Sequence, residues 1–350
     1  MKALKRDSLE RYFGSILKGC KLIEFKPLGR GVHGRGFLIS LKTKEGIKNY
    51  VLKGILPEGL GHDYPSDRAG MLLLALNNYG RLLKHVKALD VLSLGKKGIL
   101  KSIGGGKEYF LLMEQAEGTS YFKDLKEFSK KKCLDEEDKK KILLMAEYLR
   151  KIHSVKKRSR TLYLRKLRDI IGHGECLMGV FDTYPDGVLS CKRMAEIEKK
   201  CIDWRARLKD RWRRLSQIHG DFHPGNIWWA NHKDFVLLDR SRGEWGEPAD
   251  DITALAINYI FFSIKHFNAI KGAYLEGFRL FFEKYISLTG DSEILDVLAL
   301  FFAFRGAVVA NPVFYPELTQ KQRRLLFRFV INVLDSKRFI PDKVQCYLKL

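Results

Sequence analysis

The sequence contains the stretch His219-Gly220-Asp221-Phe222-His223-Pro224-Gly225-Asn226, and a short apolar segment then leads to Asp239. The order is a carboxylate, an amide five residues later and a second carboxylate after a predicted strand, Phe235 to Asp239. Kinase-type sites use one acid to orient the attacking hydroxyl, while an amide oxygen and a second acid hold Mg²⁺ on the ATP phosphates. The spacing therefore predicts a phosphotransferase with Asp221 as catalytic base and Asn226 and Asp239 as metal ligands.

The two histidines of this stretch raise the alternative of a transition-metal site. No further Cys or His cluster in the sequence would complete such a site. We therefore expect His219 to brace the loop through hydrogen bonds.

A glycine-rich segment, Gly29-x-Gly31-x-x-Gly34, lies near the N-terminus. The same pattern occurs in dinucleotide-binding folds, where a helix follows it. Here Phe37 to Leu41 alternates as a strand, which favours a strand–loop–strand hairpin whose backbone amides approach phosphate oxygens. An ordinary glycine-rich hairpin stays open as an alternative. No Gly-x4-Gly-Lys-Ser/Thr loop is present, which argues against a P-loop enzyme.

Lys53 ends the next predicted strand, Tyr50 to Lys53, where a kinase places the lysine that binds the α- and β-phosphates. A solvated surface lysine is the alternative. Its acidic partner should lie on the following helix, which contains no Glu, so Asp67 is the best candidate. That helix is predicted to begin at 65–67 with Ser66 as N-cap. Its apolar face is expected to comprise Met71, Leu72, Leu74 and Ala75.

The predicted fold class is α+β, with a small β-rich lobe over residues 1–116 and a large helical lobe over 117–350. Strands are expected at 22–28, 37–41, 50–53, 88–94 and 109–113. Beyond residue 117 the apolar spacing becomes helical. Asp135 is expected to cap a helix with apolar positions at Ile142, Met145, Ala146, Leu149 and Ile152.

The composition indicates a chain with enough apolar residues for a core and with a strongly basic charge. Apolar residues make up 45% of the 350, the formal net charge is +23 and the isoelectric point is about 9.7. Such a charge attracts anions, although a solvated basic surface is an equal alternative. The six scattered cysteines and the lack of an apolar leader predict a cytoplasmic protein. The apolar run 252–264 is too short to span a bilayer and predicts a buried helix.

Together, the stretch from His219 to Asn226, Leu238-Asp239 and Gly246-Glu247-Pro248-x-x-Asp251 resemble the signature of the aminoglycoside phosphotransferase/choline kinase group. The resemblance reaches from the glycine loop to about residue 265. It implies a bilobal protein-kinase-like fold and transfer from ATP with Mg²⁺ to a hydroxyl, with Asp251 bracing the catalytic loop. It also implies that the backbone of Met113-Glu114-Gln115-Ala116 binds adenine, in particular at Glu114 and Ala116, and that His153 is structural.

The sequence departs from that group immediately after Asp239, where it reads Arg240-Ser241-Arg242. These charges predict either an anionic acceptor or salt bridges to Glu244 and Glu247. Arg305, inside an apolar run, either reaches the acceptor or pairs with a structural acid. Aminoglycosides are polycations, so this basic chain is expected to act on a neutral or anionic, sugar-like small molecule instead.

Two other functions stay open. One is a kinase of an anionic envelope sugar or lipid that works at an acidic membrane surface; the other is a nucleotide-binding pseudokinase. The sequence carries no helix-turn-helix, zinc-finger or RNA-binding signature, so no specific nucleic-acid partner is expected.

Overall fold

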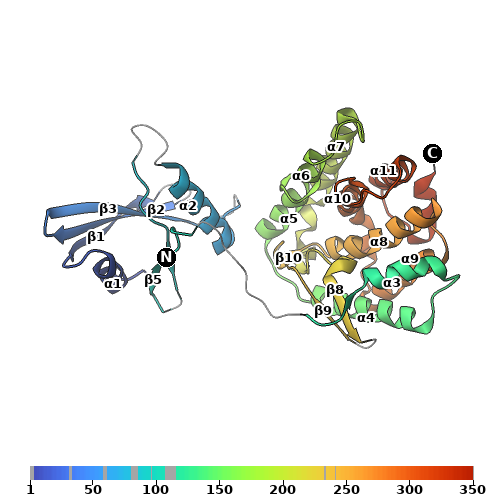
Figure 1. Ribbon diagram of the computed structural model, residues 1–350, viewed down its shortest axis with the longest axis horizontal. Coiled ribbons are helices and arrows are strands. Elements are labelled where there is room, and N and C mark those ends of the chain that lie inside the picture. Colours follow the sequence, from blue (N-terminus) through green and yellow to red (C-terminus); the bar gives the residue numbers. More distant parts are fainter. Residues whose placement is uncertain are drawn as a thin grey trace. The chain divides into compact units, whose positions relative to one another are not determined.

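A computed structural model describes residues 4–30, 34–57, 61–79, 86–95, 97–106, 116–231, 234–240 and 242–349. The chain divides into two compact units, Met1–Met113 and Glu114–Leu350 (Figure 1). Each unit is described by itself below.

The first unit is built on an antiparallel sheet of β1 (Lys21–Arg30), β2 (Gly34–Thr43) and β3 (Gly46–Ile55). The helix α1 (Arg6–Ile16) contacts β1 (Figure 1). Side chains from both elements and from β2 form a small core of Leu9, Phe13, Leu22, Ile39 and Leu41. The three strands at 22–28, 37–41 and 50–53 are thus confirmed, and each is longer than predicted.

The rest of the first unit contains α2 (Pro65–Tyr79), β4 (Leu92–Leu94) and β5 (Leu100–Ser102). Ser66 is not an N-cap, because the helix already begins at Pro65, whose fixed φ suits a first helical position. Met71 and Leu74 are exposed, so the predicted apolar face is wrong at these positions. Of the strand predicted at 88–94 only β4 forms, and the one at 109–113 lies outside the described residues.

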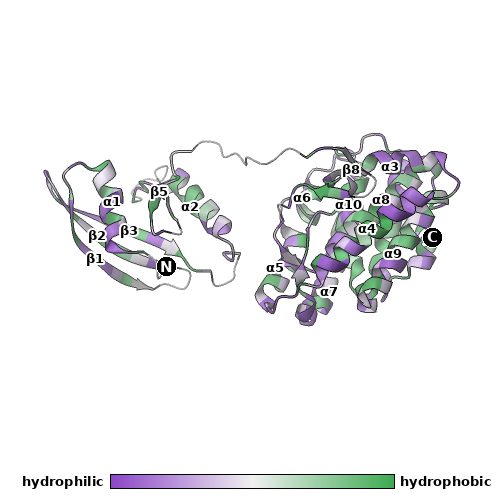
Figure 2. Ribbon diagram, turned by 90° about the horizontal axis from the view of Figure 1, so that it is seen from below, coloured by the Kyte–Doolittle hydropathy of each residue, from purple (hydrophilic) through white to green (hydrophobic). Residues whose placement is uncertain are grey.

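Long helices dominate the second unit. Asp135 caps α4 (Glu136–His153) through a reciprocal capping box with Asp138, as predicted. The apolar run 252–264 lies in α8 (Ala249–Phe267) and is buried throughout. Around it pack α9 (Gly272–Thr289), α10 (Leu298–Ala310) and α11 (Gln320–Asp335), and α4 packs on α9. Hydrophobic colour accordingly gathers on α8 and α10 in Figure 2.

Short strands of the second unit carry the motif loops. One sheet has the order β6 (Thr119–Ser120), β8 (Ile227–Asn231) and β9 (Asp234–Leu237), and a second pairs β7 (Ser216–Gln217) with β10 (Trp245–Gly246). The remaining elements are α3 (Phe122–Glu127), η1 (Phe128–Lys130), α5 (Arg160–Gly172), α6 (Leu177–Asp182), α7 (Cys191–Leu208), η2 (Lys209–Arg214), η3 (Pro224–Asn226), η4 (Ser292–Asp296) and η5 (Pro341–Leu348).

These elements confirm the predicted α+β class, with a small β-rich part followed by a large helical one. All six cysteines are free. Within the described residues, none of the helices has the length and apolar character needed to cross a membrane.

Candidate active site

The stretch 219–226 forms the connection between β7 and β8. β8 pairs with β9 so that Ile227 faces Leu237, and the backbone N–H of Leu238 donates to the carbonyl of Asn226 at 3.0 Å. Asn226 and Asp239 therefore stand at the neighbouring ends of two paired strands.

Asp251, at the start of α8, holds the beginning of this connection. Its two carboxylate oxygens accept hydrogen bonds from the backbone N–H groups of His219 (2.8 Å) and Gly220 (2.7 Å). Nε2 of His153 lies 3.1 Å from one of these oxygens. Burial alone would raise the pKa of the Asp251 carboxyl, but the hydrogen bonds and charge of His153 and His219 lower it below its usual value. The helix end and the loop are thus joined through one buried carboxylate.

The loop conformation also depends on glycine and on histidine ring nitrogens. Gly220 has a φ of +86°, in the left-handed region that favours glycine. Nδ1 of His219 accepts the backbone N–H of Asp221 at 3.2 Å, and Nδ1 of His223 accepts that of Gly225 at 3.0 Å. Both rings therefore hydrogen-bond their own loop.

Asp221 is buried, and the guanidinium groups of two arginines lie near its Oδ1. Nη1 of Arg305 lies 2.5 Å from Oδ1 and Nη1 of Arg242 lies 3.7 Å from it, whereas Oδ2 is 3.9 Å from Nε2 of His223. Burial alone would raise the pKa of Asp221, but Arg305, Arg242 and His223 together lower it to about 2. The carboxylate stays ionised at neutral pH, and its closest contacts with the two arginines are made through Oδ1.

Arg305, on α10, pairs with two acids. Besides Asp221, its guanidinium binds Oδ1 of Asp250 at 2.7 Å and the carbonyl of Gly220 at 3.0 Å. Burial alone would lower the pKa of Arg305, but the charges of Asp250 and Asp221 raise it above its usual value. Of the two predicted roles, pairing with an acid is the one that these contacts show.

Sequence reasoning missed Asp250. Its side chain is fully buried, and its second oxygen lies 2.5 Å from Nζ of Lys166 on α5. A signal was available, because Asp250 and Asp251 are adjacent acids at the start of an otherwise apolar helix, and a buried carboxylate requires a charged or hydrogen-bonding partner.

The salt bridges predicted from Arg240 and Arg242 to Glu244 and Glu247 are wrong. Arg240 donates instead to the carbonyl of Ile218 at 2.8 and 3.0 Å. Glu247 is occupied by Arg214, whose Nη2 lies 2.9 Å from Oε1.

Arg242 lies beside Asp221, and its Nε is 3.9 Å from a carboxylate oxygen of Glu175. The ring of Phe304 contacts both guanidinium groups, with its centroid 5.4 Å from Arg242 and 4.7 Å from Arg305. Two of the nitrogens of Arg242, Nε and Nη1, are buried without a hydrogen-bond partner.

Asp239 is exposed and has a φ of +52°, so the strand end turns sharply there. It lines a cavity of about 190 Å³ that His219 and Tyr148 also line. Nδ2 of Asn226 donates to the carbonyl of Asp221 at 3.0 Å, which leaves the amide oxygen as an acceptor.

The carboxylate of Asp239 and the amide oxygen of Asn226 fit Mg²⁺ as ligands, because this ion takes one or two protein oxygens and completes its shell with water and phosphate oxygens. Within the described part of the chain, no group of three or more His, Cys, Asp or Glu side chains could hold a metal ion.

The glycine-rich segment and Lys53 lie together in the first unit. β2 follows the glycines as a strand, Gly29 pairs with Gly36, and Gly36 pairs with Lys53 on β3. An ideal Cβ at Gly34 would lie 2.7 Å from the carbonyl oxygen of Gly54 and 3.9 Å from Cε of Lys53. A side chain at Gly34 would therefore displace the β3 backbone. The Lys53 side chain is exposed.

The structure describes only some of the residues that are predicted to bind the nucleotide. Gly31 and Glu114 lie outside the described residues, and Ala116 is the first described residue of the second unit. Asp67 lies in the first turn of α2, where its carboxylate accepts the backbone N–H of Tyr64 at 2.7 Å. Its ion pair with Lys53 stays a prediction.

Several solved structures are similar to the chain at low identity. The amicoumacin kinase hAmiN in complex with AMP-PNP, Ca²⁺ and Ami is 13% identical, with 98% of each chain covered and a TM-score of 0.43. Choline kinase LicA from Streptococcus pneumoniae is 14% identical, with 93% of this chain and 98% of that chain covered and a TM-score of 0.35.

The streptomycin–ATP–APH(2")-IIa complex is 14% identical, with 87% of this chain and 88% of that chain covered and a TM-score of 0.34. No curated protein matches the chain.

A sequence model of the phosphotransferase enzyme family matches residues 24–281, well over half of the chain. The matched range runs from β1 into α9, so it contains the glycine-rich hairpin, Lys53 and the stretch 219–226. It confirms the predicted enzyme class, a phosphotransferase. The chain belongs to the phosphotransferase enzyme family.

Proposed function

We propose that the protein is an ATP- and Mg²⁺-dependent kinase that transfers the γ-phosphate to a hydroxyl of a neutral or anionic, sugar-like small molecule. One observation carries the proposal. Asp221 is buried and ionised, and it lies on the same loop as Asn226. The backbone carbonyl of Asn226 accepts a hydrogen bond from the N–H of Leu238, the residue before Asp239. An acid beside two oxygen donors is the arrangement that phosphoryl transfer requires.

In this proposal Oδ2 of Asp221 accepts the hydrogen bond of the acceptor hydroxyl and aims its oxygen at the γ-phosphate. With a pKa of about 2, Asp221 is a weak proton acceptor, so its main contribution is orientation and electrostatics. Asn226 and Asp239 hold the metal ion. Mg²⁺, when bound, neutralises charge on the phosphate oxygens.

We assign nucleotide binding mainly to the first lobe, residues 1–116. The glycine-rich hairpin with Gly29, Gly31 and Gly34 would cover the phosphates, and Lys53, which faces Gly36 across the sheet, would bind them. The backbone at Glu114 and Ala116 would bind adenine. The second lobe, residues 117–350, would supply catalysis and the acceptor site, in a protein of the cytoplasm.

The charges beside Asp221 support an acceptor that is not a polycation. Arg305 is hydrogen-bonded to two carboxylates. Arg242 also has two carboxylates nearby, but Asp221 and Glu175 lie 3.7 and 3.9 Å away, beyond hydrogen-bond distance, and two of its buried nitrogens lack hydrogen-bond partners. Arg242 is therefore the better candidate to bind an anionic group of the acceptor, such as a carboxylate or phosphate.

A second candidate is a kinase of an anionic envelope sugar or lipid at the membrane surface. It is favoured by two basic segments of the sequence. One is residues 150–168, with nine Lys or Arg, and it includes most of α5; the other is residues 205–214, with six, at the end of α7 and in η2. The packing of α5 against η2 and α7 brings these segments side by side. Binding to acidic vesicles that falls with added salt would support this candidate.

The test is a thermal-shift series with ATP, GTP and ADP, each with Mg²⁺ or with EDTA, followed by phosphate-transfer assays on anionic and neutral sugars. We expect stabilisation by a nucleotide only with Mg²⁺, and transfer that is lost in Asp221→Ala while nucleotide binding persists. Full transfer in Asp221→Ala would contradict the base assignment. No stabilisation by any nucleotide would contradict both the kinase and the nucleotide-binding pseudokinase, and would favour a kinase-like fold that binds a partner instead.

A further inference from the structure

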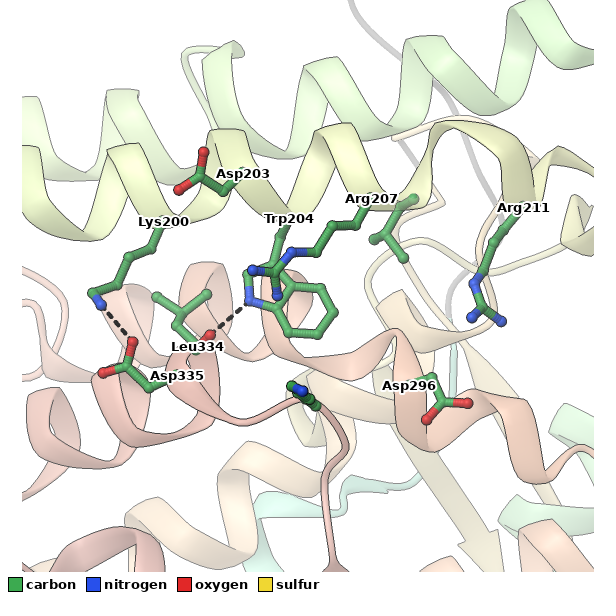
Figure 3. Close-up of a pocket in the computed structure, with 10 residues that line it drawn as sticks. Lys200, Asp203, Trp204, Arg207, Arg211, Asp296, Leu334 and Asp335 are labelled. Carbon is green, nitrogen blue, oxygen red and sulfur yellow. Dashed lines mark hydrogen bonds and ion pairs between the residues drawn. The ribbon is translucent and has the colours of Figure 1, made fainter.

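A second cavity, of about 700 Å³, lies in the second unit where α7 and η2 face the end of α11 and η4 (Figure 3). It is lined by Lys200, Asp203, Trp204, Arg207, Leu208, Arg211, Asp296, Leu334, Asp335 and Lys337. None of these residues belongs to the loop 219–226 or to the Asp239 turn. The cavity is therefore separate from the candidate catalytic residues of this unit.

The acids of the lining are largely neutralised by neighbours. Asp335 forms an ion pair with Lys200, and Asp296 pairs with Arg338 at 2.7 Å. In Figure 3 the carboxylate of Asp203 points away from the other labelled side chains. Little negative charge therefore remains to repel an anion.

The cations that line the cavity have fewer ion-pair partners than the acids. Among the described residues, neither Arg207 nor Lys337 has a carboxylate within salt-bridge distance, and both are exposed. Arg211 lies 3.6 Å from Glu293, whose own side chain is 63% exposed, so that contact is weak. Three cations thus face the cavity with little compensation.

Arg207 is also held in position. Its guanidinium carbon lies 5.2 Å from the ring centroid of Trp204, and Figure 3 shows the guanidinium against the face of the indole. Trp204 is buried, and its Nε1 donates to the carbonyl of Leu334 at 2.8 Å, which ties α7 to the end of α11. The guanidinium edge therefore stays exposed on a fixed platform, and less ordering is needed when it binds a ligand.

We propose that this cavity binds a phosphate-bearing anion, independently of the proposed catalytic reaction. The planar fork of an arginine matches the geometry of phosphate oxygens, and three cations suit a group that carries more than one charge. The volume exceeds the needs of one inorganic ion, which fits a larger phosphorylated molecule. The source of the phosphate is either a soluble compound or the headgroup of an anionic phospholipid.

The test compares two double variants of the full chain that lose the same charge. Arg207→Gln/Lys337→Gln removes two cations of the cavity, and Lys192→Gln/Lys199→Gln removes two exposed lysines of α7 that do not line it. One arm titrates inorganic tripolyphosphate by calorimetry in EDTA, which suppresses binding through Mg²⁺. The other arm measures co-sedimentation with phosphatidylglycerol/phosphatidylcholine vesicles.

Each cation near an anionic surface strengthens binding about fivefold. We expect the cavity variant to weaken binding at least about tenfold and the control variant to change it much less. If the cavity variant weakens the binding of tripolyphosphate but not of vesicles, the ligand is a soluble compound. If it weakens the binding of vesicles, the ligand is a lipid headgroup. Equal weakening by both variants would overturn the proposal in favour of general surface charge, and so would the absence of binding to either probe by the unaltered protein.

Discussion

The guanidinium of Arg305 bridges the carboxylates of Asp221 and Asp250, at 2.5 and 2.7 Å. These acids come from the motif loop and from the start of α8, and Arg305 comes from α10. One buried cation thus ties the residue proposed as catalytic base to two helices of the core. The position and the charge state of Asp221 consequently depend on a residue far from the motif in sequence.

The first prediction concerns that cation. Arg305→Met removes the cation that joins two buried carboxylates and leaves only Lys166 beside Asp250 and Arg242 beside Asp221, so it should lower the free energy of unfolding by about 3–5 kcal/mol. The matched control is Arg338→Met, which removes an exposed partner of Asp296 and should cost about 0–1 kcal/mol. Urea unfolding of both variants checks this, and similar losses in the two would contradict it.

The second prediction follows from the lowered pKa of Asp221. A carboxyl whose pKa is lower in the folded than in the unfolded state stabilises the fold above the unfolded pKa, and this stability disappears as pH falls through the folded pKa. For Asp221 the window runs from 3.8 down to about 2. The contribution at neutral pH is at most about 2 kcal/mol.

Urea unfolding at several pH values, on the unaltered protein and on Asp221→Asn, checks this second prediction. The unaltered protein should lose stability more steeply than the variant below about pH 4. Parallel curves would show that Asp221 is not held ionised by its arginines.

The third prediction concerns Asp251. Asp251→Asn replaces one of two accepting oxygens with a donor, so one of the two backbone N–H groups of His219 and Gly220 loses its partner. We expect a loss of about 1–3 kcal/mol of stability and a large loss of phosphate transfer, because the loop that carries Asp221 is no longer fixed. Unfolding and transfer assays check this; unchanged transfer would mean that Asp251 does not position the loop.

Local patterns predicted much of the fold. The helix cap at Asp135 and the three β-strands of the first unit depend on neighbouring residues, and all four are found where they were predicted. Where a local signal was ambiguous, prediction failed. Ser66 suits an N-cap, but Pro65 before it suits the first helical position equally well, and the helix begins there.

The contacts of the candidate site were harder to predict, because they join distant segments. Arg305 is 84 residues from Asp221 and 55 from Asp250, and no spacing rule connects them. An arginine in an apolar run indicates that an acidic partner exists but not which acid it is. The same limit applies to Glu247, which the sequence offers as one possible partner of Arg240 or Arg242 and which pairs with Arg214 in the structure.

The last prediction tests the metal ligand. Asp239 has a positive φ, which Asn tolerates well, so Asp239→Asn removes the charge without straining the turn. Because the side chain is exposed, stability without ligand should change by less than about 0.5 kcal/mol. The stabilisation that ATP gives with Mg²⁺ should fall to the level seen in EDTA. Asp234→Asn, an exposed acid of the same hairpin, is the control and should keep the Mg²⁺-dependent shift. If Asp239→Asn also keeps it, the metal is held by other residues.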